Sequence, residues 1–198
     1  MKYKYLITVL LVSASALLSS YVGAAQYASP DGTVILKAEI IEISSAGVTA
    51  KGSVHLEATD KIAKTDMKAD AKEIKVRFFE TGKKGLTGLD AVKSADIIGR
   101  MHLEYSTVDT EGNVLKSTAD ADNGVYSGMD KIMHLNGNVN ITHNNPAVFG
   151  APASAKGDKA IINLTPNLPA DVAKFRIEST IEPSIIEFTP KKAAGESK

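Results

Sequence analysis

The stretch HLNGNVNI, His134–Ile141, decides how the whole chain is interpreted. Asn136-Gly137 between apolar residues is typical of a two-residue β-hairpin turn, which would end one strand and begin another. The period-two pattern favours one strand instead, because apolar residues or glycine occupy every second position from Met133 to Ile141. We therefore predict a single unbroken strand, with Gly137 on its apolar side.

The same pattern, apolar-x-Gly-x-Val/Met-x-Leu/Ile, occurs three times, around Gly52, Gly99 and Gly137. It alternates with a second unit in which a small residue is followed by an acid. Repeats of this size are typical of stacked supersecondary units that bury a shared apolar face. We therefore predict an all-β, antiparallel fold built from repeated strand pairs. The second unit begins at Ala38, Ala69, Ala119 and Gly157.

Composition limits the classes of function. A chain of 198 residues suits one domain, and 43% apolar residues can form a sizeable core. The absence of cysteine excludes a disulfide framework, a thiolate metal site and a cysteine nucleophile. With 23 basic and 23 acidic residues the net charge is zero, which argues against a nucleic-acid partner.

The N-terminus has the composition of a targeting segment. Two lysines precede an apolar run, residues 6–18, and small residues follow it. We predict that residues 1–25 form a signal peptide cleaved after Ala24 or Ala25, which places the mature domain in a periplasm. The alternative is a retained membrane anchor, since about 18–20 residues are enough to span a bilayer.

Turn-forming residues and the repeats set the other boundaries. We predict one domain over residues 26–189, with an exposed loop inserted at 81–88, where glycines recur. Residues 175–178 and 185–188 have the composition of closing strands. Residues 190–198 are predicted to be a disordered tail.

The opening stretch and the later segment AKGDKAIINL resemble the OstA-like family, the periplasmic lipopolysaccharide-transport proteins of the LptA type. The resemblance covers roughly residues 33–165 and depends on short motifs, with Ser53 and Arg100 in place of the asparagine in the earlier repeats. The residues that carry it are Leu135, Gly137, Asn138 and Val139 in the first unit and Gly157, Asp158 and Ala160 in the second.

This resemblance implies a V-shaped antiparallel β-jelly roll, or β-taco, open along one side. It also implies an apolar groove that holds the acyl chains of lipopolysaccharide or a related glycolipid on their way to the outer membrane. Family members stack end to end through their terminal strands. The implied partners are therefore this lipid, other lipopolysaccharide-transport components and further copies of the chain in a head-to-tail oligomer.

The apolar sides of the three glycine-aligned strands are our candidate lipid-binding groove. A glycine within a strand marks a bend or the close approach of a backbone or ligand. A filled β-sandwich core, in which the glycines only bend the strands, remains the alternative. A further alternative is an exported structural protein that assembles by pairing of its edge strands. The candidate groove residues are Val54, Leu56, Ile97, Met101, Leu103, Leu135, Val139 and Ile141.

Little in the sequence indicates catalysis or metal binding. His55 and His102 each follow a repeat glycine by three residues, but no third ligand stands at a characteristic spacing. No nucleophile elbow is present. We therefore predict no enzyme activity, no metal and no cofactor. Because Asp70, Asp120 and Asp158 recur with the repeat, we expect them to have a structural role, such as holding turns.

Several lysines remain as candidates for contact with lipid phosphates at the mouth of the groove. The alternative is that they only form a solvated surface. They are Lys61, Lys64, Lys68, Lys83 and Lys84.

Overall fold

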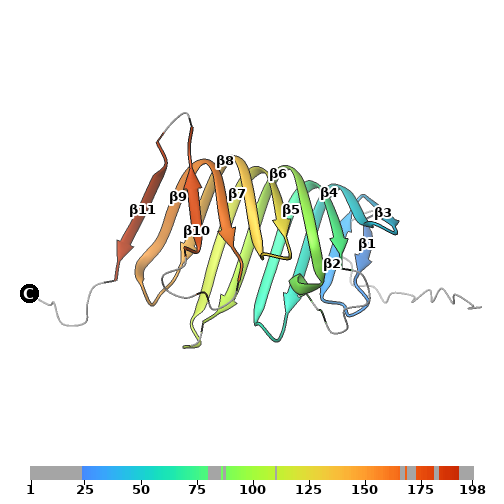
Figure 1. The fold of residues 1–198 in the computed structure, drawn as a ribbon, viewed down its shortest axis with the longest axis horizontal. Helices are drawn as coiled ribbons and strands as arrows, with labels where there is room; N and C mark the ends of the chain where they lie inside the picture. Colours follow the sequence, from blue (N-terminus) through green and yellow to red (C-terminus); the bar gives the residue numbers. More distant parts are fainter. Residues whose placement is uncertain are drawn as a thin grey trace, which may run out of the picture.

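In the computed structural model the chain forms a single antiparallel sheet (Figure 1). The structure describes residues 24–79, 86, 88–109, 111–165, 168, 173–180 and 183–191. Within them the strand order is β1-β2-β4-β5-β6-β7-β8-β9-β10, with β3 also paired to β4 and β11 to β9. The strands are β1 Ala25–Ala28, β2 Val34–Ala38, β3 Ile40–Ser44, β4 Gly47–Asp60, β5 Thr65–Phe78, β6 Val92–Val108, β7 Val114–Ser127, β8 Ile132–Asn144, β9 Phe149–Asn163, β10 Phe175–Glu178 and β11 Ile185–Pro190, and a 3₁₀ turn, η1, covers Gly88–Ala91.

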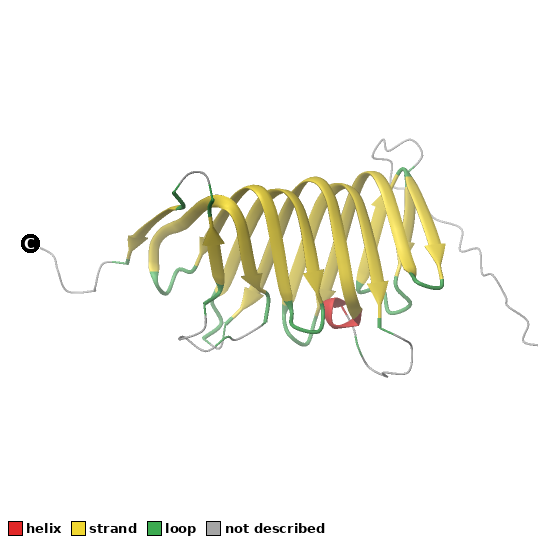
Figure 2. Cartoon of the chain, turned by 45° about the horizontal axis from the view of Figure 1, so that its top comes forward, coloured by secondary structure: helices red, strands yellow, loops and turns green. Residues whose placement is uncertain are grey.

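The opening stretch lies inside one strand, β8, as predicted. At Gly137 and Asn138 this strand has two residues where β9 has only Asp158, which is a β-bulge. β4 carries the same bulge at its repeat glycine opposite β5, and β6 carries it opposite β7. Aligned across the sheet, the three bulges form what we call the fold line. Along it the long strands bend and arch side by side (Figure 2).

The fold line divides the sheet into two arms. The first arm contains β3, β10 and the segments 47–51, 73–78, 92–98, 123–127, 132–136 and 159–163 of the long strands. The second arm contains β1, β2, β11 and the remaining segments, 54–60, 65–71, 101–108, 114–121, 139–144 and 149–157. The inner sides of both arms belong to one hydrophobic cluster, so the arms pack face to face. The V-shaped all-β jelly roll is thereby confirmed.

The prediction that the repeat glycines lie on the apolar side is wrong. Gly137 has a φ of 76°, and a Cβ there would point at the exposed side chain of Asp122, not into the interior. Its neighbour Asn138 is also left-handed, with a φ of 48°, which asparagine tolerates better than most residues. The glycine is therefore needed where the strand turns the corner, next to a side chain of the adjacent strand.

Only every second strand keeps its alternation across the fold line. In β8 the buried positions Leu135 and Val139 are four residues apart, so the extra bulge residue preserves the period of two. In β7 the buried positions Ala121 and Gly124 are three apart, with two consecutive exposed residues between them. β5 slips in the same way between Ala71 and Ile74. The two strand types of the repeat thus turn the same corner by different means.

The predicted boundaries of the signal segment, the domain and the tail stay predictions. The two closing strands are present as β10 and β11, but β11 continues to Pro190, where we predicted the tail to begin. Of the predicted signal segment, residues 1–23 lie outside the described residues, and β1 already begins at Ala25. Most of the predicted loop at 81–88, and residues 192–198 of the predicted tail, also lie outside them.

Candidate functional site

The inner side of the second arm is graded from apolar to polar. Four rows of residues run across its strands, joined by cross-strand pairing except where the register shifts at the fold line, between Ala71 and Met101 and between Ala121 and Val139. The two rows next to the fold line are apolar, the third is mixed, and the fourth lies at the far end of the arm. In order from the fold line the rows are Val54, Ala71, Met101, Ala121, Val139 and Gly157, then Leu56, Ala69, Leu103, Ala119, Ile141 and Ala155, then Ala58, Met67, Tyr105, Ser117, His143 and Ala153, and last Asp60, Thr65, Thr107 and Leu115.

Residue size also alternates from strand to strand in the two apolar rows. β4, β6 and β8 contribute valine, leucine, methionine and isoleucine, whereas β5, β7 and β9 contribute only alanine and glycine. The small residues therefore form stripes that run from the fold line outward along the strand direction. Ridges of larger aliphatic side chains flank each stripe.

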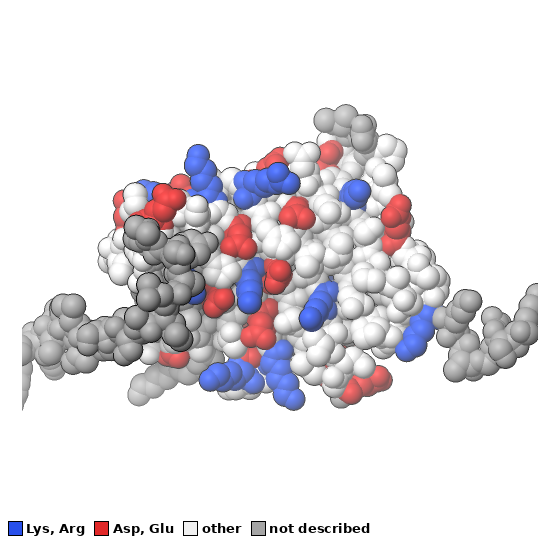
Figure 3. Space-filling model, turned by 180° about the vertical axis from the view of Figure 1, so that it is seen from behind, with Lys and Arg blue, Asp and Glu red and all other residues white. Residues whose placement is uncertain are grey.

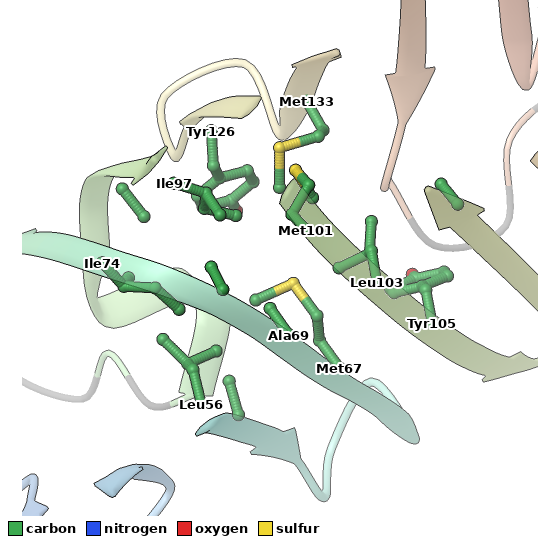
Figure 4. Close-up of a cluster of buried hydrophobic side chains, with 14 of the residues drawn as sticks. Leu56, Met67, Ala69, Ile74, Ile97, Met101, Leu103, Tyr105, Tyr126 and Met133 are labelled. Atoms are coloured by element: carbon green, nitrogen blue, oxygen red, sulfur yellow. The ribbon is translucent and has the colours of Figure 1, made fainter. Parts of the chain in front are cut away.

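The opposing arm is more uniformly apolar. Its two inner rows contain aliphatic residues such as Ile74, Ile97 and Met133, with Tyr126 as the exception. Figure 4 shows these side chains and those of the second arm pointing toward one another. The space between the arms is thus an apolar interior.

All eight candidate groove residues face this interior. Each is between 1% and 3% exposed, and all belong to one cluster. In the structure the two arms are in contact, so these side chains pack against each other. That they bind lipid stays a prediction.

The far ends of the arms meet along what we call the seam, opposite the fold line. Among the described residues two side-chain hydrogen bonds cross it: the Tyr105 hydroxyl donates to the carbonyl oxygen of Leu164 at 2.9 Å, and the Gly88 amide donates to Thr33 Oγ1 at 2.7 Å. Two aromatic contacts cross it as well, Tyr27 with Phe78 at 6.0 Å between ring centroids and His143 with Phe175 at 6.2 Å. These few contacts hold the seam closed.

A basic cluster lies at the seam around Tyr105. The Lys174 ammonium stands over the Tyr105 ring, 5.1 Å from its centroid, and burial lowers the pKa of this lysine to about 8. His143 is buried and accepts from or donates to Ser117 Oγ at 2.9 Å through Nδ1. Burial and the nearby Lys174 charge both lower the pKa of His143. Burial also raises the pKa of Tyr105 to about 12, so the phenol stays neutral.

Sequence reasoning missed this cluster. Its members come from β6, β8 and the residue just before β10, which meet only through the order of strands in the sheet. A half-buried lysine next to a closing strand gives no recognisable pattern. The one signal available was the polar residue His143 at an inward position of β8.

Two buried hydroxyls face the interior without a hydrogen-bond partner in the described part of the chain, Thr107 Oγ1 and the Tyr126 phenol. Burial, followed by the charge of Asp90, raises the pKa of Tyr126. Such groups cost free energy when left unpaired, so they are usually satisfied by a partner or a ligand.

The two histidines singled out in the sequence lie outside the interior. On the outer side of the second arm, His55 Nδ1 is 2.7 Å from an Asp70 carboxylate oxygen and His102 Nδ1 is 2.9 Å from one of Asp120. Asp70 also pairs in register with His102, so these residues form one polar row. Within the described residues no group of three or more potential ligands is placed to hold a metal ion.

The recurring acids have structural contacts, but they are not equivalent. Asp70 and Asp120 form the histidine pairs, whereas Asp158 lies at the fold line and accepts hydrogen bonds from the amide and hydroxyl of Thr180. The position that corresponds to Asp158 in β7 is Asp122, not Asp120.

The candidate lysines are divided between different places. Lys61 and Lys64 are exposed in the β4–β5 turn at the seam, while Lys68 lies on the outer side, 4.0 Å from Glu57. Lys83 and Lys84 lie outside the described residues. Charges of both signs are mixed over the face seen in Figure 3. A hollow over β5, β6 and β7 is lined mainly by polar residues such as Asp66 and Lys116.

Comparison with solved structures places this geometry among known folds. The fold resembles that of LptH. That protein is the LptA-homologous periplasmic component of the conserved lipopolysaccharide transport device from Pseudomonas aeruginosa. The match has a TM-score of 0.52 and covers 80% of this chain and 95% of LptH, at 8% sequence identity. At this identity the likeness is one of fold alone.

No protein-family model and no curated protein matches the chain. Among the described residues no helix is long and apolar enough to cross a membrane.

Proposed function

We propose that the chain is a non-enzymatic periplasmic carrier that holds the acyl chains of lipopolysaccharide, or of a related glycolipid, between its two arms. The observation that carries this proposal is the gradient on the inner side of the second arm. Apolar rows next to the fold line suit acyl chains, and the mixed rows at the seam suit the polar end of the same molecule.

The stripes of small residues indicate how the chains would lie. Alanines on β5, β7 and β9 between aliphatic ridges leave shallow troughs directed from the seam to the fold line. Each buried methylene contributes about 0.8 kcal/mol, so a few acyl chains supply ample binding energy. The lipid would replace the contacts that the arms make with each other, and opening the seam costs only the few interactions that cross it.

The likeness to LptH supports the same assignment, because it is a likeness of fold to a periplasmic lipopolysaccharide-transport component. The predicted signal segment agrees with export. We further propose that the terminal strands dock other transport components or further copies of the chain.

A photocrosslinking side chain tests the groove. Placed at Val139, which faces the interior, or at the half-buried inward Ser117, it should form lipid adducts in protein purified from a native periplasm. Placed at Asn138, which is exposed at the fold line, it should not. Adducts at Asn138 without adducts at the two inward positions would contradict the proposal.

A second candidate function is a structural protein that assembles through edge strands. β11 is exposed along its length and carries Ile185, Ile186 and Phe188, and β3 at the other end exposes Ile40 and Ile43. Exposed strand edges are templates for pairing with another chain. Native mass spectrometry separates the two candidates: retained lipid on monomers favours the carrier, and lipid-free oligomers that grow with protein concentration favour assembly.

A further inference from the structure

The basic cluster at the seam lacks a counter-ion. Lys174 has no hydrogen bond or ion pair to a carboxylate in the described part of the chain, and burial is the cause of its lowered pKa. His143 lies close enough for the Lys174 charge to lower its own pKa. A half-buried lysine and a buried histidine are thus placed together at the seam.

The acids at the seam are engaged elsewhere. Asp60 accepts hydrogen bonds from the amides of Ile62 and Ala63 at 2.9 Å each. Asp90 pairs with Lys131 at 2.8 Å. Besides the exposed Lys61 and Lys64 of the β4–β5 turn, the seam contains Lys131, which pairs with Asp90, and the half-buried Lys174, which has no acidic partner among the described residues.

From this arrangement we infer that Lys174 and His143 form an anion-binding site that recognises a phosphate group on the headgroup of a bound amphiphile. The inference rests on the proposed function, and it adds the chemical class of the headgroup. Phosphate offers several strong acceptor oxygens and forms charge-assisted hydrogen bonds with ammonium and imidazolium groups.

The position of the cluster fits an amphiphile better than a free anion. Both Tyr105 and His143 belong to the third row, and the Lys174 ammonium lies over the Tyr105 ring. This row is next to the apolar row of Leu103, Ala119 and Ile141, on the side toward the seam. Acyl chains on the apolar rows would bring the headgroup to this level. Thr107, in the row nearer the end of the arm, places a buried hydroxyl next to Tyr105 at the same level of the seam.

Binding of matched ligands tests the inference. The probes are a diacylated glucosamine that carries a phosphate, the same diacylated glucosamine without it, and inorganic phosphate, each titrated into the full chain by calorimetry. We expect the phosphorylated amphiphile to bind about ten- to a hundredfold more tightly than the unphosphorylated one, as for a hydrogen-bonded charge pair. Inorganic phosphate should bind far more weakly than either.

Variants locate the site. Lys174→Gln should abolish the difference in affinity between the phosphorylated and unphosphorylated amphiphiles and leave binding of the unphosphorylated one unchanged. Lys174→Arg, which keeps the positive charge, should retain most of that difference in affinity. Lys131→Gln is the matched control, because it removes a seam lysine that already has a partner, and it should preserve the difference in affinity. Circular dichroism checks that each variant is folded.

The outcomes separate the two proposals. If wild-type protein binds neither amphiphile, the proposed function itself is wrong. If it binds both equally, or if Lys174→Gln weakens both equally, the carrier function stands and the phosphate site is wrong. If inorganic phosphate binds as tightly as the phosphorylated amphiphile in a Lys174-dependent way, the site takes a free anion and the headgroup assignment is overturned.

Discussion

Replacing Gly137 with alanine tests the corner that organises the repeat. An L-residue at a φ of 76° costs about 1–2 kcal/mol relative to glycine. The new methyl group would also overlap the Asp122 carboxylate and lie 2.9 Å from the Cβ and Cγ of that residue. The Asp122 side chain would have to rotate and give up its 2.8 Å hydrogen bond from Asn138, worth about 1 kcal/mol. We expect Gly137→Ala to lower the free energy of unfolding by roughly 2–3 kcal/mol.

Urea unfolding followed by circular dichroism measures this loss. Gly112→Ala is the matched control: its φ is 87°, but nothing lies within 4 Å of the added methyl group, so only the same backbone cost of about 1–2 kcal/mol applies. Adding Asp122→Ala to Gly137→Ala should relieve the steric overlap and so restore that part of the free energy of unfolding. The part lost through the left-handed backbone should not be restored. Equal losses for Gly137→Ala and Gly112→Ala would show that the close approach at the fold line is unimportant.

Three further predictions concern the seam and the outer side. Tyr105→Phe should lower the free energy of unfolding by about 1 kcal/mol, because it removes the hydrogen bond to Leu164 across the seam. Tyr126→Phe should leave the free energy of unfolding unchanged or raise it, because the buried Tyr126 hydroxyl has no partner among the described residues. Thermal unfolding compares the two variants. A larger loss of stability for Tyr126→Phe than for Tyr105→Phe would contradict this prediction. The hydrogen bond to Asp120 raises the pKa of His102, so its stabilisation should be present below about pH 6.5 and should be lost as the pH rises through the raised pKa. His102→Gln should therefore lower the free energy of unfolding by less than about 1 kcal/mol, because the pair is half-exposed, and by more in acidic than in alkaline urea titrations. A decrease in the free energy of unfolding that does not depend on pH would refute the pairing.

The sequence predicted the glycine-containing strands well because their alternation passes through the corner unbroken. In β4 and β8 the extra bulge residue keeps buried positions an even number apart, so a period of two is visible from end to end, and in β6 the same period runs from Ala95 to Thr107. This is why the hairpin interpretation of Asn136-Gly137 could be rejected from the pattern alone. All eight candidate interior residues were found for the same reason.

The intervening strands were harder to predict. β5, β7 and β9 change phase at the fold line, so no single alternation spans them and their acids were aligned in the wrong register. Asp158 was grouped with Asp70 and Asp120, although it corresponds to Asp122. The direction of the repeat glycines was also missed, because parity does not reveal a left-handed backbone.

The seam could not be predicted because it depends on contacts between distant segments. Tyr105 meets Leu164 and Lys174 only after nine strands have been placed in order. The resemblance to the LptA type implied a groove with an open side. The structure adds that this side is closed by specific contacts whose removal can be tested one at a time.

The fold line ties the length of the interior to the number of long strands. Because every long strand crosses from one arm to the other, each added pair of strands lengthens both walls together by about 10 Å, at roughly 4.8 Å per strand. Duplication or loss of one repeat would change how many acyl chains fit without altering the cross-section that each one meets. Evolution of such a protein could therefore adjust capacity by copying a unit of about forty residues, while the chemistry of each layer stays the same.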